Sequence, residues 1–144
     1  MVTEETSILK LMHGYAHKFD DADFEGFAQL FSRGTLEFRG LGPPMIGPEA
    51  VLSFIRSRVI LYDGRPCTNH LMHNALIDVA PDGKTAAARS YVQILQSVPD
   101  FPIQTIGTGR YLDRFAADEG GWHFVERVGI GSLRGDFSRH LQPA

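Results

Sequence analysis

The first twenty residues carry apolar side chains at intervals of three or four, which predicts a helix with one buried face. That face consists of Ile8, Met12, Tyr15, Ala16 and Phe19. Thr6 or Ser7 can cap the beginning of this helix, and the helix is expected to end near Asp20 and Asp21. Gly14 in its middle costs about 1 kcal/mol relative to alanine, so packing of the apolar stripe has to hold the helix.

Two more helices are predicted before residue 60. Asp21 or Asp23 can cap a short second helix. Its buried face comprises Phe24, Phe27, Leu30 and Phe31. Pro48 suits the first position of a third helix. The apolar side of that helix comprises Val51, Phe54, Ile55 and Val59. Between these helices, residues 35–39 alternate as in a short strand, and residues 40–47 read as a loop with room for a brief strand at 45–46.

From residue 68 onward the pattern changes to alternation interrupted by turns. Four long strands are predicted, at residues 68–79, 85–98, 103–116 and 122–132. Residues 133–144 are expected to form an irregular tail. Helices followed by a meander of long strands predict an α+β fold. We expect one domain, residues 1–144, shaped as a cone-shaped α+β barrel in which three N-terminal helices pack on the concave face of a strongly curved antiparallel sheet.

Four short segments carry a resemblance to a known family. They read YAHKFDDADF at 15–24, GPEA at 47–50, TNH at 68–70 and GWHF at 121–124. In this order and spacing the chain resembles the nuclear-transport-factor-2-like superfamily, and within it the SnoaL-like and scytalone-dehydratase-like branch. The resemblance spans nearly the whole chain and implies the same cone-shaped fold. It does not by itself imply one activity, because the superfamily holds enzymes, carriers and non-catalytic subunits.

The resemblance also implies a site. Several lyases of this superfamily use an aspartate at the end of the first helix and a histidine that opens the strand after the third helix. Asp20 and His70 fall on those two positions. In a bile-acid dehydratase of the group a tyrosine lies five residues before the aspartate, as Tyr15 does here. Scytalone dehydratase has a tyrosine and a second histidine where this chain has Phe19 and Leu95, so the resemblance implies a class of reaction and not a substrate.

Two histidines compete for the position that faces the interior. Strand alternation places His73 with Ala75 and Ile77 on the more apolar face and puts His70 on the opposite one. The resemblance favours His70, in which case His73 falls at an interface on the other face. Histidines three apart on a strand point to opposite faces, so His70, His73 and Asp20 are not expected to chelate a metal.

These observations predict a cofactor-independent, dehydratase-like lyase or isomerase that acts on a small, mostly apolar cyclic or polyketide-like compound. His70 would be the general base or acid, Asp20 its partner and Tyr15 a hydrogen-bond donor. The predicted cavity lining is apolar and comprises Phe19, Phe24, Phe31, Phe54, Leu95 and Trp122. The alternative is a non-catalytic small-molecule-binding or accessory subunit of the same fold. Contact between Asp20 and His70 inside the cavity would favour the enzyme.

Composition and charge limit which kinds of binding partner the protein can be expected to have. The net charge is -3 with no basic segment, which argues against a nucleic-acid surface. The N-terminal residues lack the features of a signal peptide and no apolar run approaches the roughly 20 residues of a membrane span, so we expect a cytoplasmic protein without a membrane contact. One cysteine, Cys67, excludes an internal disulfide. No phosphate loop or metal-ligand set appears, so no cofactor is expected. Apolar residues on both strand faces, such as Val92 and Tyr91, predict a homodimer or higher homo-oligomer through the convex sheet face.

Overall fold

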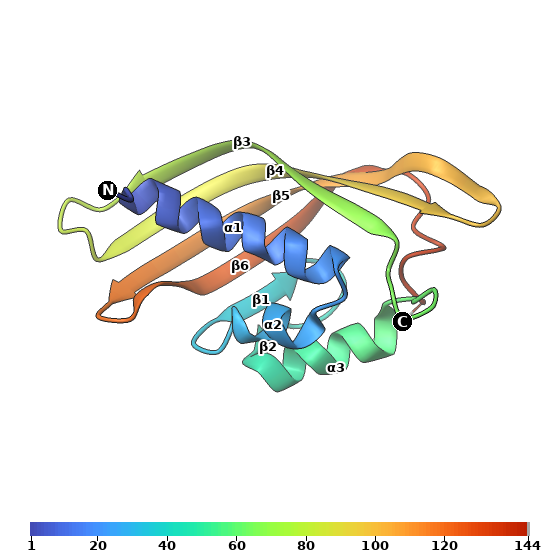
Figure 1. The fold of residues 1–144 in the computed structure, drawn as a ribbon, viewed down its shortest axis with the longest axis horizontal. Helices are drawn as coiled ribbons and strands as arrows, with labels where there is room; N and C mark the ends of the chain where they lie inside the picture. The colour runs from blue at the N-terminus through green and yellow to red at the C-terminus, as the bar shows by residue number, and fades with distance from the viewer. Residues whose placement is uncertain (144) are drawn as a thin grey trace.

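The computed structural model describes residues 1–143 and places all helices before the long strands (Figure 1). The helices are α1 (Glu4–Asp20), α2 (Phe24–Gln29) and α3 (Pro48–Arg58). The strands are β1 (Thr35–Phe38), β2 (Met45–Ile46), β3 (Thr68–Val79), β4 (Thr85–Val98), β5 (Phe101–Asp118) and β6 (Gly121–Arg134). No helix in residues 1–143 is long and apolar enough to cross a membrane.

The helix α1 begins earlier than the sequence suggested. Its cap is Thr3 rather than Thr6 or Ser7, and the Thr3 hydroxyl accepts a hydrogen bond from the Thr6 backbone N–H at 3.1 Å. The earlier cap puts two glutamates in the first turn, where they interact favourably with the helix dipole. The apolar stripe of α1 is buried as predicted, from Ile8 through Phe19. This burial fixes the side on which the last residue of the helix, Asp20, faces the sheet.

The six strands form one sheet in the order β2-β1-β6-β5-β4-β3. The pairs among β3, β4, β5 and β6 are antiparallel, as predicted, but β1 pairs with β6 in parallel. The sheet is therefore mixed. No tight hairpin joins β1 to β6, so the connection does not impose the antiparallel direction that it imposes on the meander strands.

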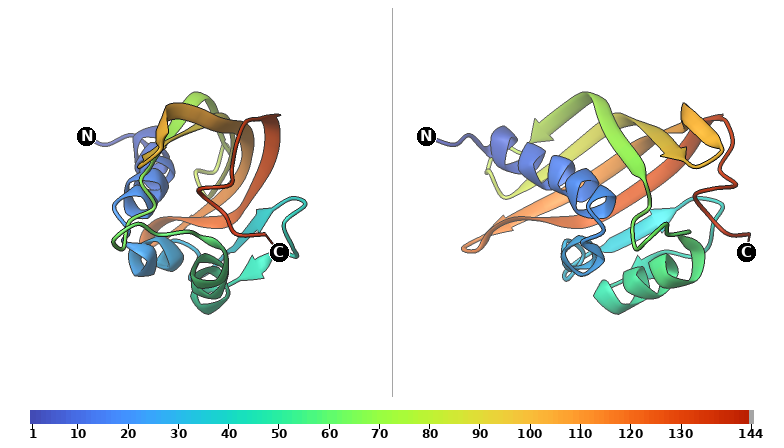
Figure 2. Two further views of the ribbon diagram at one scale, coloured as in Figure 1. Left: turned by 90° about the vertical axis from the view of Figure 1, so that its right-hand side faces the viewer. Right: turned by 45° about the vertical axis from the view of Figure 1, so that its right-hand side comes forward.

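The sheet curls around α1, while α2 and α3 lie against its β1 end (Figure 2). Register shifts interrupt the pairings β3–β4, β4–β5 and β5–β6. Such bulges bend a strand and increase its twist, which gives the sheet its curvature. On the concave side, the apolar stripe of α1 packs against buried residues of the long strands, including Val92 of β4 and Tyr111 and Phe115 of β5.

The C-terminal segment after β6 is irregular, as predicted, but it is tied to the body of the protein. The Gly135 N–H donates to the Ile106 carbonyl at 2.9 Å, and the chain then runs back to α3 (Figure 1). There the Ile60 N–H donates to the His140 carbonyl at 2.9 Å. Phe137 lies against Gly107, where a Cβ atom would come within 2.5 Å of its ring. The glycine thus leaves space for the segment to close over the sheet.

Candidate active site

Asp20 and His70 form a hydrogen-bonded pair between the end of α1 and the beginning of β3. The Asp20 Oδ1 and His70 Nδ1 atoms are 2.7 Å apart. The His70 backbone N–H donates to the other carboxylate oxygen at 2.7 Å, and the Thr68 hydroxyl donates to Oδ1 at 2.8 Å. Both side chains are largely buried, at 13% and 9% exposure. The β3 backbone therefore fixes the carboxylate, and the carboxylate fixes the imidazole.

The arrangement defines the tautomer of His70. A carboxylate only accepts hydrogen bonds, so the ring proton of a neutral His70 sits on Nδ1. This leaves the Nε2 lone pair free, and no residue in 1–143 donates to it. The ring also packs edge-on against Phe19, with centroids 5.0 Å apart. An imidazole oriented in this way can take a proton at Nε2 while its partner carboxylate stabilises the charge that develops.

His70 lines a cavity of about 750 Å³ on the concave side of the sheet. This volume lies in the range of roughly 300–1,000 Å³ that is typical of small-molecule sites. Its walls are mostly apolar and include Phe27, Leu36, Val51, Ile55, Val59, Val92 and Ile94. Asp20 does not line it, because the carboxylate lies behind the His70 ring and borders a separate small hollow. His70 is thus the member of the pair that a ligand in the cavity can reach.

Of the six residues that the sequence suggested as cavity lining, Phe19 and Phe54 border the cavity. Phe24 instead packs edge-on against Phe19, with centroids 5.4 Å apart. Phe31 is fully buried in the core and stacks on the Phe124 ring.

The remaining two predicted lining residues also lie elsewhere. On β4 the alternation presents Val92 and Ile94 to the cavity, so Leu95 faces the other side and borders the small hollow near Asp20. Trp122 pairs with Ala117 beside the β5–β6 turn and packs on the core away from the cavity. Leu95 lies outside the cavity because strand alternation turns it away from the face of Ile94, whereas Trp122 packs on the core near the β5–β6 turn, beyond the end of the cavity.

His73 lies on the convex face and is exposed. Its Nε2 contacts the Gln93 amide oxygen at 3.2 Å, outside the cavity. The simple alternation that grouped His73 with Ala75 and Ile77 is broken by a bulge between His73 and Leu76, where Asn74 adopts a φ of 53°. Because the extra residue reverses the alternation, Ala75 and Ile77 share the inner face with His70 and not with His73.

Tyr15 lines the cavity one helical turn before Phe19, and Tyr111 of β5 lines it beside Tyr15, with ring centroids 5.4 Å apart. Burial raises the pKa of both phenols, and for Tyr15 the neighbouring Tyr111 raises it further. Both hydroxyls therefore remain protonated hydrogen-bond donors around neutral pH. Tyr111 was not among the predicted site residues, although its place on the inward side of β5 follows from alternation.

A second ion pair lies behind the two tyrosines. Arg127 of β6 and Asp113 of β5 are directly paired across the strands and form two hydrogen bonds of 2.7 and 2.8 Å. Both side chains are completely buried. The guanidinium lies over the Tyr111 and Tyr15 rings, at 3.8 and 4.3 Å from their centroids. The Asp113–Arg127 pair thus packs against the two tyrosine rings, and neither Asp113 nor Arg127 lines the cavity.

His140, from the C-terminal segment, also faces the cavity and was given no role by the sequence. Its ring centroid is 6.1 Å from that of His70 and 5.8 Å from that of Phe19. Burial, together with the smaller effect of the nearby His70, lowers the pKa of His140 to about 3. Within the described part of the chain, no group of three His, Cys, Asp or Glu side chains could hold a metal ion.

This fold and cavity agree with the family comparison. The model of the SnoaL-like domain matches residues 1–128, so the chain belongs to the SnoaL-like family. No curated protein matches the chain significantly in sequence. Solved structures of this fold include a candidate scytalone dehydratase, a candidate aromatic ring hydroxylase and a protein of unknown function.

Solved structures share the fold across most of the chain. A Mycobacterium tuberculosis protein of unknown function is 25% identical, with 90% of this chain and 72% of that chain covered and a TM-score of 0.73. An NTF2-like protein with a cystatin-like fold from Novosphingobium aromaticivorans is 20% identical, with coverages of 89% and 81% and a TM-score of 0.74. A candidate scytalone dehydratase from the same organism is 22% identical, with coverages of 92% and 87% and a TM-score of 0.72.

Proposed function

We propose that the protein is a cofactor-independent lyase or isomerase of the dehydratase type, acting on a small, mostly apolar cyclic or polyketide-like hydroxy-ketone. The observation that carries this proposal is the Asp20–His70 pair, whose imidazole reaches the cavity while its carboxylate stays behind the ring. A passive apolar pocket gains nothing from a desolvated acid–base pair, which costs free energy to bury. The likeness to a candidate scytalone dehydratase supports the same class of reaction.

The reaction can be written with the chain's own residues. The His70 Nε2 removes a proton from the carbon next to the ketone, and the Asp20 carboxylate stabilises the imidazolium. The Tyr15 hydroxyl donates a hydrogen bond to the ketone oxygen as negative charge develops there. The imidazolium then returns its proton to the hydroxyl on the β-carbon. That C–O bond breaks, a C=C bond forms and water leaves. No electrons enter or leave overall, so the sequence of steps needs no redox cofactor.

The test uses β-hydroxy-α-tetralone, a bicyclic ketone with its hydroxyl on the β-carbon. Loss of water followed by enolisation gives α-naphthol, which is identified by mass spectrometry and fluorescence. We expect the purified protein to form α-naphthol faster than buffer does, with turnover unchanged by exhaustive chelation and without added nucleotide. The alternative of a non-catalytic binding subunit predicts that the ketone binds but that no α-naphthol forms. That result, extended over a panel of cyclic hydroxy-ketones, would contradict the proposal.

A further inference from the structure

The His140 ring is a buried polar group without a partner. The residue is 4% exposed, and neither ring nitrogen forms a hydrogen bond with any residue in 1–143. Its Nδ1 atom is completely buried. Buried polar groups are hydrogen-bonded in the great majority of cases, because an unpaired one costs roughly 1–3 kcal/mol. Because Nδ1 has no accessible surface, Nε2 is the ring nitrogen that a ligand can reach, and His140 lines the cavity beside the Asp20–His70 pair.

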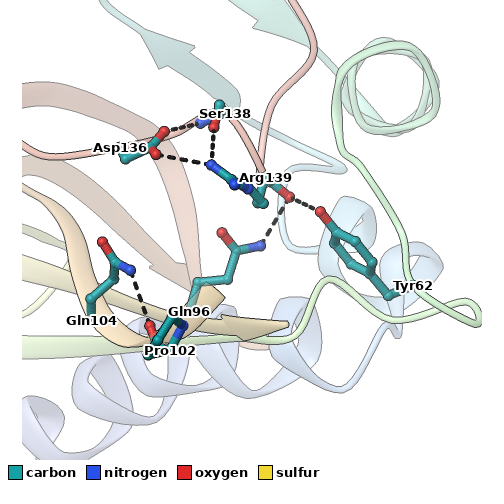
Figure 3. Close-up of polar contacts among 7 residues, drawn as sticks. All are labelled: Tyr62, Gln96, Pro102, Gln104, Asp136, Ser138 and Arg139. Atoms are coloured by element: carbon teal, nitrogen blue, oxygen red, sulfur yellow. Dashed lines mark hydrogen bonds and ion pairs between the residues drawn. The ribbon is translucent and has the colours of Figure 1, made fainter. Parts of the chain in front are cut away.

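The position of His140 is imposed by its neighbours along the chain. The Arg139 carbonyl accepts hydrogen bonds from the Tyr62 hydroxyl at 2.7 Å and from the Gln96 side-chain amide at 3.0 Å (Figure 3). The His140 carbonyl accepts a further bond from the Ile60 N–H. Gln96 is itself buried and also donates to the Pro66 carbonyl. Strand β4 and the residues between α3 and β3 thus hold this segment in place, as a rigid site requires.

The protonation state of His140 gives it a role different from that of His70. With a pKa lowered to about 3 by burial, it is a neutral imidazole at physiological pH. A neutral imidazole donates one hydrogen bond and accepts another without taking up a proton. His70, in contrast, is oriented by a carboxylate at Nδ1 and has a free Nε2 at the cavity. The cavity end therefore contains one histidine arranged to move a proton and one arranged to bind an oxygen.

We propose that His140 binds the substrate hydroxyl that leaves, and so holds it next to His70. The proposal deepens the proposed dehydration and rests on it. Tyr15, the proposed donor to the ketone oxygen, lies one helical turn before Phe19 on α1. His140 instead lies next to Phe19 and His70. A hydroxyl that is held by a hydrogen bond to the neutral His140 ring is oriented next to His70 before its C–O bond breaks, which lowers the entropic part of the barrier.

Two unreactive probes separate hydroxyl recognition from catalysis. β-Tetralol carries the hydroxyl and lacks the ketone, and tetralin lacks both. We would measure their dissociation constants by NMR titration for the wild type, His140→Phe, His140→Gln and His123→Phe. His123 is a matched control, because it is a half-buried histidine with an unpartnered Nδ1 outside the cavity. Circular dichroism of each variant checks that the fold is intact.

The wild type should bind β-tetralol roughly 2–10-fold more tightly than tetralin, the worth of one hydrogen bond. This ratio should fall to about 1 in His140→Phe, be partly restored in His140→Gln and stay unchanged in His123→Phe. The ¹⁵N signals of the His140 ring should shift with β-tetralol and not with tetralin. A wild type that does not discriminate between the probes, or a ratio that survives in folded His140→Phe, would overturn the proposal.

The outcomes also separate this inference from the proposed function. If the hydroxyl preference depends on His140 but no cyclic hydroxy-ketone is dehydrated, the binding role of His140 stands and the lyase assignment fails. If dehydration is found and the hydroxyl preference is absent, the lyase stands and the role of His140 is rejected.

Discussion

The molecule contains two buried pairs of a carboxylate and a nitrogen base. They differ in whether a nitrogen of the base can still bind a ligand. Asp113 and Arg127 form two hydrogen bonds with one another and are completely buried, and the Arg127 guanidinium lies over aromatic rings with its Nη1 unpartnered among residues 1–143. Asp20 and His70 share one side-chain bond, and the far nitrogen of the imidazole is left unoccupied at a cavity. Guanidinium cannot give up its proton in proteins, whereas imidazole can.

The comparison shows that burial and charge do not by themselves mark a functional pair. The Asp113–Arg127 pair supports the Tyr15 and Tyr111 rings and has no access to a ligand. The pair at the end of α1 combines a titratable base, an orienting carboxylate and access to the cavity. The Asp113–Arg127 pair is expected to determine stability and the Asp20–His70 pair to determine turnover, and mutations can separate these two expectations.

The largest effect should appear in turnover. His70→Ala and Asp20→Asn should each lower kcat for β-hydroxy-α-tetralone by on the order of 10²–10⁴, the usual worth of a placed acid–base group. The double variant should lose little more, because the two residues act as one unit. Binding of β-tetralol should weaken far less, since the apolar walls supply most of the affinity. Full activity in Asp20→Asn would refute the role of the pair.

The Asp113–Arg127 pair should act on folding. Arg127→Met leaves the Asp113 carboxylate buried without a partner and should lower the free energy of unfolding by about 3–5 kcal/mol. Replacing both residues, with Asp113→Leu and Arg127→Met, should cost less than the single change. Arg114→Met is the matched control. Arg114 follows Asp113 on β5, and its pair with Glu126 is exposed and worth about 0–1 kcal/mol. Urea denaturation measures all three, and equal losses in Arg114→Met and Arg127→Met would contradict this account.

The buried neutral histidine should make stability depend on pH. The pKa of His140 is about 3 in the folded protein, compared with about 6.5 for an unfolded chain. Below pH 6.5 the unfolded state therefore takes up a proton that the folded state refuses, and stability falls as the pH falls towards 3. Between pH 7 and pH 5 this contribution amounts to about 2 kcal/mol. His140→Gln should lose that much less stability over the same interval, and identical pH profiles of variant and wild type would reject the assignment.

The smallest effect on chemistry should come from the convex face, which we propose to be a homodimer interface. Exposed apolar side chains on β3, β4 and β5 gather there, namely Leu71, Leu76, Tyr91 and Leu112. His73→Ala should leave kcat unchanged and weaken assembly. Sedimentation should show a species larger than the 16.0 kDa chain at micromolar concentration. A monomer alone would contradict the interface, and loss of turnover in His73→Ala would reverse the assignment of the two histidines.

The sequence predicted the helices, the meander and the resemblance to the family, because these depend on periodicity and on order along the chain. It could not decide between His70 and His73 from alternation, since a single bulge at Asn74 exchanges the faces of β3. A bulge in β5–β6 has a similar effect. An unbroken register from the turn would pair Asp113 with Glu126, whereas the shifted register pairs it with Arg127.

The role of the C-terminal segment was also beyond sequence reasoning. Residues 135–143 have no periodic pattern, and the bonds that hold them come from distant partners such as Tyr62 and Gln96. Side chains that meet through such long-range contacts leave no local signal. His140 could be recognised only after the segment was seen to return to the cavity.

The most direct test of the central claim is proton exchange on a ketone that cannot dehydrate. α-Tetralone has exchangeable hydrogens next to its carbonyl and no leaving hydroxyl, so deuterium uptake from D₂O reports proton removal alone. We predict that the wild type and His73→Ala accelerate uptake at this carbon, as followed by ¹H NMR, and that His70→Ala slows the catalysed rate by on the order of 10² or more. Absence of catalysed exchange in the wild type, or undiminished exchange in folded His70→Ala, would contradict the assignment of His70 as the proton-transferring base.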